Sequence, residues 1–180
     1  MSPSIPAMDV RPSPLAGTWY PGDPAQLAQS VDSYLDRAEV APIDGRLIGV
    51  LAPHAGHRYS GAVAAHAFKL ARGMDIDLVA VLGPSHYPYR GPVVTARHDA
   101  YSTPLGTVPV AHDLLDALSG NIPLQYVRED QEHSLENEIP FLQRALGEFR
   151  LLPLALVDQS LALAELLGAT LGTLLSGQKA

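Results

Sequence analysis

The chain contains no cysteine among its 180 residues. This absence excludes disulfides, thiolate nucleophiles and cysteine-ligated metal within the chain, and it leaves the redox compartment open. Positive charge is also scarce, because 12 Lys and Arg face 19 Asp and Glu, for a formal net charge of −7. Lys and Arg form no cluster, so we expect neither a nucleic-acid-binding surface nor a polybasic contact with a membrane.

Signals for export or membrane insertion are missing as well. The amino terminus lacks a basic segment followed by an apolar one, so we predict no secretory signal and expect a cytoplasmic protein. The longest apolar stretch, residues 161–175, contains Glu165, two Gly and two Thr. It is shorter than the roughly 20 residues of a spanning helix, so we interpret it as a buried or amphipathic helix.

The composition that is present indicates one globular domain. Hydrophobic residues make up 47% of the chain and charged residues 17%, which is typical of a domain with a sizeable core. Residues 1–14 contain four Pro and three Ser, a composition that predicts a flexible, then extended, segment. We therefore expect a flexible amino-terminal segment over 1–14 and a single domain over 15–180.

The fold class follows from the stretch 46–91. Residues 46–52 and 78–82 are almost unbroken apolar runs, which is typical of strands covered on both faces. Residues 60–72 between them have apolar side chains at helical spacing. This order predicts a βαβ unit, and hence an α/β fold with a mostly parallel central sheet flanked by helices.

The same patterns predict the other elements. Asp23 and Pro24 are an N-cap and first residue typical of a helix start. We expect helices at 114–118, 139–146 and 161–175, strands at 92–96, 125–128 and 151–157, and a loop with a short strand over 100–110.

Two histidines follow the two central strands. His54 and His86 each follow the end of a predicted strand. If the strands are parallel neighbours, about 4.8 Å apart, both imidazoles can enter one crevice at the carboxyl edge of the sheet, where open α/β sheets bind ligands. Neutral imidazole is a common ligand of Fe, Cu and Zn. The alternative is that each His only caps a strand or binds a loop carbonyl.

A second polar stretch lies at 127–142. It places several acidic side chains close to His133, and Glu136 follows His133 by three residues, on the same face if the segment is helical. We expect His133 and Glu136 to line the crevice as acid/base or metal-shell groups. The alternative is that the acids form a solvated face near a helix amino terminus.

Taken together, these motifs resemble the Memo family, the B component of the bacterial and archaeal AmmeMemoRadiSam set. The matching segments, in the family's order, are VRPSPLAGTWYPGD, APHAGHRYSG (52–61), LGPSHYPY (82–89), AYSTPLG (100–106) and EHSLENEIPFLQ (132–143). The resemblance implies a fold related to the LigB-type class III extradiol dioxygenases, which have a mononuclear non-haem iron site. It implies that His54 and His86 are metal ligands and that His133 and Glu136 are pocket residues.

The chain also differs from the family pattern. It has His57 where the family usually has Tyr. It lacks the later Ser-Asp-x-x-His motif and the further ligand, often Cys, so it resembles the amino-terminal two thirds of a family member and we expect a carboxyl-terminally incomplete sheet. An exposed sheet edge would favour a homo-oligomer.

The resemblance leaves three functions open. The first is a dioxygenase-like oxidoreductase that uses Fe(II), with Cu or Zn as alternative metals, on an unidentified small-molecule substrate. The second is a non-enzymatic metal-binding or protein-interaction module that works beside a radical SAM partner. The third is Zn-assisted hydrolysis, with water activated near Glu136.

Overall fold

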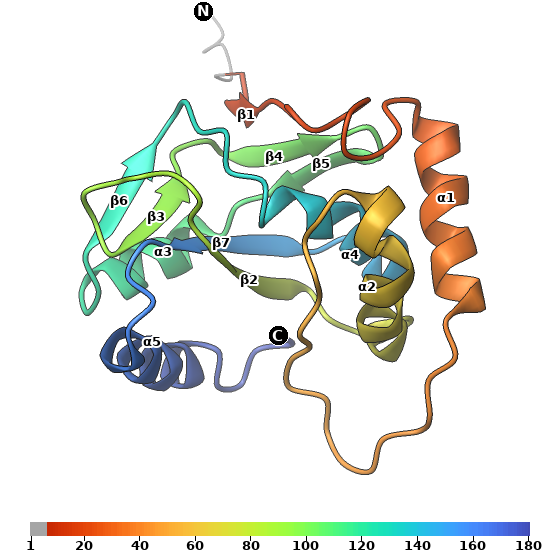
Figure 1. Ribbon diagram of the computed structural model, residues 1–180. Coiled ribbons are helices and arrows are strands. Elements are labelled where there is room, and N and C mark those ends of the chain that lie inside the picture. Colours follow the sequence, from red (N-terminus) through yellow and green to blue (C-terminus); the bar gives the residue numbers. More distant parts are fainter. Residues whose placement is uncertain (1–6) are drawn as a thin grey trace, which may run out of the picture.

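The structure is a computed structural model that describes residues 7–180 (Figure 1). Over this range the chain forms two sheets and five α-helices. The strands are β1 (Val10–Arg11), β2 (Leu78–Pro84), β3 (Val93–Ala96), β4 (Ala100–Thr103), β5 (Gly106–Pro109), β6 (Leu124–Val127) and β7 (Arg150–Leu156). The helices are α1 (Pro24–Arg37), α2 (His57–Ala71), α3 (His112–Ser119), α4 (Ile139–Leu146) and α5 (Leu161–Leu174), with a 3₁₀ turn, η1, at Glu136–Glu138.

The larger sheet has four strands in the order β2-β7-β3-β6. β2 and β7 are parallel, β3 and β6 are parallel, and only β3 and β7 pair antiparallel. The expectation of an α/β fold with a mostly parallel central sheet is therefore confirmed. β7 lies between two neighbours, and Leu151, Leu152 and Leu154 on it are fully buried, which explains why its sequence is apolar on both faces.

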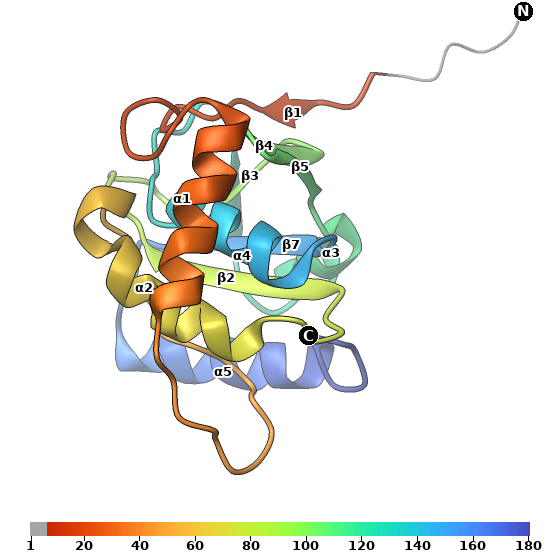
Figure 2. The same cartoon turned by 90° about the vertical axis from the view of Figure 1, so that its right-hand side faces the viewer.

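The helices cover this sheet from two sides. α1, α2 and α4 pack against one another, and α3 packs against α5. The views in Figures 1 and 2 agree that α1 and α4 lie on one side of the four-stranded sheet and α5 on the other. None of the helices within residues 7–180 combines the length and hydropathy needed to cross a bilayer.

Local sequence signals determine where α1 and α4 begin. The Asp23 side chain accepts a hydrogen bond from Gln26 N at 2.9 Å, and Pro24 occupies the first turn of α1, as predicted. Leu27, Val31 and Leu35 then form the buried stripe of that helix. α4 begins at Ile139, also as predicted, because proline is tolerated in a first turn where its missing N–H has no partner.

The smaller sheet differs from the sequence prediction. Residues 100–110 form the antiparallel hairpin β4–β5 instead of a loop with a short strand, and β1 pairs in parallel with β4. Gly106 has a φ of 126°, a conformation that glycine adopts without a Cβ penalty, and it closes the hairpin turn. Pro109 is accommodated because β5 is an edge strand.

The amino-terminal residues are described only in part. Residues 1–6, on which part of the predicted flexible segment 1–14 falls, lie outside the described range. Val10 and Arg11 form β1, and the Arg11 side chain is buried.

The predicted strand at 46–52 is wrong. These residues form neither helix nor strand, and Ile48 and Leu51 are 87% and 95% exposed. An apolar run becomes a strand only where a neighbouring strand pairs with its backbone, and in this structure β7 is the strand that pairs with β2. The central unit therefore consists of an irregular segment, α2 and β2, and is not a complete βαβ unit.

Candidate metal centre

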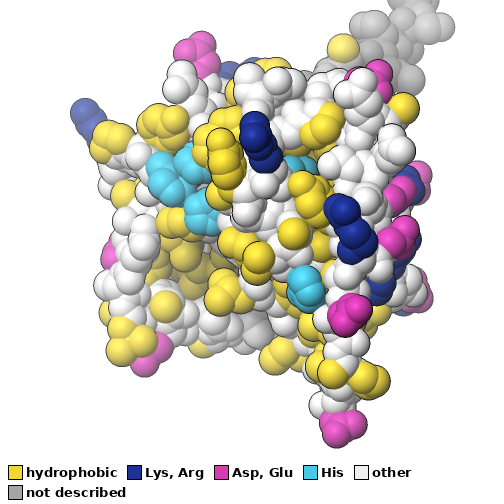
Figure 3. All heavy atoms as spheres, turned by 45° about the vertical axis from the view of Figure 1, so that its right-hand side comes forward, with side chains coloured by type: hydrophobic (Ala, Val, Ile, Leu, Met, Phe, Trp, Pro, Cys, Tyr) yellow, Lys and Arg dark blue, Asp and Glu magenta, His cyan; other side chains and the backbone are white. Residues whose placement is uncertain are grey.

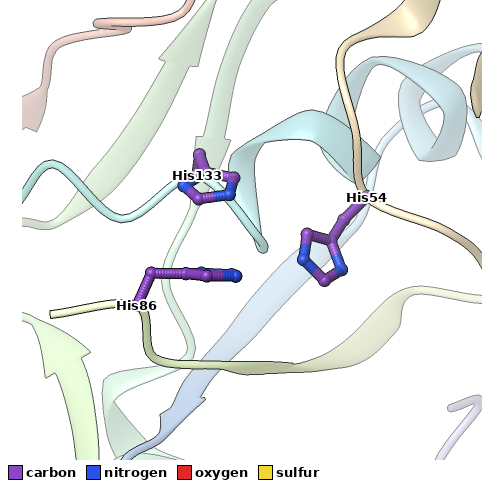
Figure 4. Close-up of side chains that lie close together, drawn as sticks. All are labelled: His54, His86 and His133. Atoms are coloured by element: carbon purple, nitrogen blue, oxygen red, sulfur yellow. The ribbon is translucent and has the colours of Figure 1, made fainter. Parts of the chain in front are cut away.

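Three histidines from separate parts of the chain meet beside the end of β2. One ring nitrogen from each of His54, His86 and His133 lies within 4.8 Å of the others. The ring centroids of His86 and His133 are 4.2 Å apart and nearly stacked, and the His54 ring lies 5.3 Å from His86 at 63°. Figure 4 shows the three rings around a common space.

His54 reaches this space from the loop before α2. The Asn137 side-chain amide donates to the His54 carbonyl oxygen at 2.7 Å. Three residues later, the His57 backbone N–H donates to the Trp19 carbonyl oxygen at 2.9 Å. The loop is thus held from both sides, although the strand predicted before it does not form.

His86 follows the carboxyl end of β2, as the sequence predicted. Ser85 N donates to Leu156 O at 2.8 Å and extends the pairing of β2 with β7 by one residue. The chain then turns, and the Glu132 carboxylate accepts from both the backbone N–H and the ring Nδ1 of His86, at 2.6 and 2.9 Å. His86 is therefore oriented by a residue 46 positions later in the sequence.

His133 arrives on the loop between β6 and η1. This loop approaches β2 so closely that a Cβ at Gly83 would lie 2.6 Å from Ser134 Oγ. At this short distance the Ser134 hydroxyl donates a hydrogen bond to the Pro84 carbonyl oxygen at 2.9 Å. Glycine at position 83 is thus what allows the loop to bring His133 over the end of β2. The Trp19 ring lies 4.4 Å from the His133 ring on another side.

The electrostatics of the site favour neutral imidazoles. Burial, and then the neighbouring His86, lower the pKa of both His54 and His133. A neutral ring nitrogen is the form that binds a metal. The site remains open to solvent, because the side chains of His86 and His133 are 39% and 17% exposed. The space-filling view shows histidine side chains gathered at the surface beside apolar ones (Figure 3).

Glu132 is the ionised group nearest to the histidines. Burial acts to raise its pKa, but hydrogen bonds from the backbone N–H groups of His86 and Ser134 and from the His86 ring lower the pKa to about 2. The sequence pattern does not distinguish Glu132 from the other acidic residues around His133. Its position directly before His133 was the available signal, but the pairing with His86 depends on tertiary structure.

Glu136 does not join the three histidines. Its carboxylate is fully buried and accepts from Arg11 Nη1 at 2.5 Å, Ser13 Oγ at 2.8 Å and Tyr20 Oη at 2.7 Å. His133 and Glu136 do not share a helical face, because η1 begins only at Glu136 and His133 precedes it. In this structure Glu136 anchors the amino-terminal segment.

His57 also lies outside the group. It is the first residue of α2, is 3% exposed and packs between the rings of Tyr20 and Phe141. Its Nε2 lies 2.9 Å from the Asn137 carbonyl oxygen. It contributes to the packing of α2 against η1 and α4.

The three histidines suit a divalent metal ion of the transition series. Three neutral imidazoles with open positions are a known donor set for catalytic Zn, and imidazole also suits Fe and Cu. The group contains no carboxylate, since Glu132 faces the Nδ1 side of His86 and Glu136 is bound elsewhere.

The fold and the site define a class: an α/β domain with a three-histidine cluster at the carboxyl end of a sheet strand. The chain belongs to the Memo-like protein family, which it matches over residues 11–180.

Curated relatives agree with this assignment. A MEMO1 family protein of Thermotoga sp. (strain RQ2) is 36% identical over 172 residues, which cover 87% of this chain and 61% of that protein. One from Nitrosopumilus maritimus is 33% identical over 168 residues, covering 88% and 61%. One from Methanopyrus kandleri is 36% identical over 167 residues, covering 86% and 59%. The chain spans about three fifths of the length of these relatives.

Proposed function

We propose that this chain binds one divalent metal ion through His54, His86 and His133, and that it acts as a metal-dependent oxidoreductase with Fe(II) as its metal. The observation that supports this proposal is the convergence of three ring nitrogens within 4.8 Å of one another. A single structural histidine has no reason to lie near two others, and here burial, and then the neighbouring His86, lower the pKa of both His54 and His133 and so disfavour their protonated forms.

Iron is favoured by the family resemblance to mononuclear non-haem iron enzymes, and the donor set is compatible with it. Bound Fe(II) would supply a redox-active centre for the O₂-dependent oxidation of a small molecule. The chain itself would contribute three neutral ligands, an open side toward solvent and the ring of Trp19 beside His133. If His133 binds the metal, it could not also act as the acid or base that the sequence led us to expect.

One observation favours a second candidate, Zn-assisted hydrolysis. The donor set consists of histidines alone, and three histidines plus water form a well-known catalytic Zn site. Iron oxygenase sites, by contrast, commonly include a carboxylate with two histidines. Metal preference therefore separates the two functions.

An anaerobic metal titration tests the proposal. The 180-residue chain is titrated with Fe(II), desalted, and assayed for bound metal, alongside the single variants His54→Ala, His86→Ala and His133→Ala. The matched control is His66→Ala, since His66 is exposed on α2 and outside the cluster. We expect one Fe(II) per chain in the wild type and the control, and loss of binding in each of the three variants.

The contrary results are distinct. Retention of stoichiometric iron by His133→Ala would remove His133 from the ligand set, and retention by all three variants would overturn the metal site.

Competition between Fe(II), Zn(II) and Cu(II) for the site measures its metal preference. O₂ consumption with catechols would support the oxidoreductase, and Zn-dependent ester cleavage would support the hydrolase. Iron binding without turnover would favour the non-enzymatic module beside a radical SAM partner.

A further inference from the structure

We infer that Glu132 is a positioning residue that holds His86 in one tautomer and holds the backbone of His133 in place, so that both rings face the same point. This inference rests on the proposed metal site and extends it to a residue that does not touch the metal. The evidence for it is the hydrogen-bond geometry of the Glu132 carboxylate.

The Glu132 carboxylate accepts four hydrogen bonds, and each donor is an N–H group. Oε1 accepts from His86 Nδ1 at 2.9 Å, from His133 N at 2.8 Å and from Ser134 N at 2.9 Å. Oε2 accepts from His86 N at 2.6 Å. A carboxylate has two oxygens and accepts only, so it matches four N–H donors without conflict.

The contact with Nδ1 determines which nitrogen of His86 is available. An ionised carboxylate cannot donate, so Nδ1 bears the proton and Nε2 presents its lone pair. Metal-binding histidines commonly donate their other N–H to a carboxylate, which fixes the tautomer and the ring orientation. Glu132 makes this contact while its neighbour His133 belongs to the same cluster.

Glu132 is itself held in place. The side chain is 6% exposed, and its backbone N–H donates to Asp130 Oδ1 at 3.0 Å. Its carbonyl oxygen accepts from Arg11 Nη2 at 3.1 Å, and the same guanidinium binds Asp130 at 2.8 and 2.9 Å. The backbone of Glu132 is therefore fixed by hydrogen bonds, and its carboxylate has few alternative positions.

If Glu132 only stabilised the loop, its replacement by Gln would not change the His86 tautomer. If Glu132 positions His86, the same replacement should change it. In Glu132→Gln one carboxylate oxygen becomes an NH₂ group, which cannot accept from the N–H donors around it. Where this NH₂ group replaces Oε1 and faces Nδ1 of His86, the favoured response is the other tautomer, with Nδ1 accepting and the proton on Nε2. Where it replaces Oε2, the oxygen beside Nδ1 has lost its negative charge and holds the Nδ1–H form less strongly. The Nε2–H tautomer would block the nitrogen that faces the cluster, even if the loop kept its shape.

The test is NMR of metal-free protein with ¹⁵N-labelled histidine, with His86 assigned through His86→Ala. We expect His86 to be protonated on Nδ1 in the wild type and to shift toward the Nε2–H tautomer in Glu132→Gln, while circular dichroism stays unchanged. Fe(II) affinity should fall about 10- to 100-fold. Glu132→Asp, which keeps the charge, should retain the wild-type tautomer and recover part of the affinity. Glu129→Gln, an exposed acid of the same loop, is the matched control and should change neither quantity.

The two proposals fail in different ways. If the wild type binds no metal but His86 shows the tautomer dependence on Glu132, the metal site is wrong and the positioning role stands. If Glu132→Gln leaves both the tautomer and the affinity unchanged, the positioning role is overturned. If Glu132→Gln does not fold, the wild-type tautomer decides, since an Nε2–H form of His86 would overturn the inference.

Discussion

Arg11 and Glu136, which are 125 residues apart in the sequence, form an ion pair in which the two side chains are 3% and 0% exposed. The Arg11 guanidinium also binds Asp130, and it lies over the Tyr101 ring at 4.8 Å. These contacts connect β1 to both ends of the loop that contains Glu132 and His133. The shape of the candidate metal centre depends on this amino-terminal contact.

Removal of Arg11 should therefore be costly. Arg11→Met leaves the Glu136 and Asp130 carboxylates buried without their cation, and breaking a buried pair in this way typically costs about 3–5 kcal/mol in the free energy of unfolding. The measurement is urea denaturation. Arg72→Met is the matched control, because the Arg72–Asp36 pair is 39% and 64% exposed, and it should cost no more than about 1 kcal/mol. Equal costs for the two variants would contradict the importance of the buried pair.

Glu138 should make stability depend on pH. Its side chain is 8% exposed with Oε2 unpaired, and burial raises the pKa of Glu138 to about 8. An unfolded Glu has a pKa of about 4.3. Between these values the folded state retains a proton that the unfolded chain has released, so the free energy of unfolding falls as pH rises, by up to about 1.4 kcal/mol per pH unit.

The variant Glu138→Gln removes this titration. Urea denaturation at pH 4.5, 6, 7 and 8 should show the variant close to the wild type at the lowest pH and increasingly more stable than the wild type as pH rises. Parallel pH profiles for the two proteins would show that Glu138 is ionised in the folded state at neutral pH.

Trp19 should report metal binding directly. It is the single tryptophan of the chain, and its ring lies 4.4 Å from the His133 ring. A paramagnetic ion at the cluster should quench its fluorescence, with saturation at one equivalent of Cu(II), whereas Zn(II) has a filled d shell and should bind without quenching. His66→Ala should behave as the wild type. Quenching that persists in the His54→Ala/His86→Ala variant would place the copper elsewhere.

The exposed segment 46–52 should contribute little to stability despite its apolar sequence. Ile48→Ser combined with Leu51→Ser should change the free energy of unfolding by no more than about 1 kcal/mol, because both side chains are already in water. Leu78→Ala, at a fully buried position of β2, should cost about 2–5 kcal/mol. A large loss in the serine variant would mean that this segment is packed in solution.

Much of the fold could be predicted because its signals are local. The start of α1 depends on Asp23 and Pro24, and the buried face of that helix on the spacing of Leu27, Val31 and Leu35. The strand at 46–52 and the loop at 100–110 could not be predicted correctly, because pairing is a property of two segments. Within residues 7–180 the first has no pairing partner, whereas β4 pairs with both β1 and β5.

Local sequence patterns were enough to predict the α/β class, the main helices, the buried strands β2 and β7, and His54 and His86 as candidate ligands beside α2 and β2. These follow from periodicity, capping residues and short motifs, which act within a few residues. Long-range contacts were needed to establish that His133 lies beside the two histidines, that Glu132 binds His86, and that Glu136 pairs with Arg11. The physical reason is that a buried carboxylate must find donors wherever the fold supplies them, and here these come from residues 46 and 125 positions away.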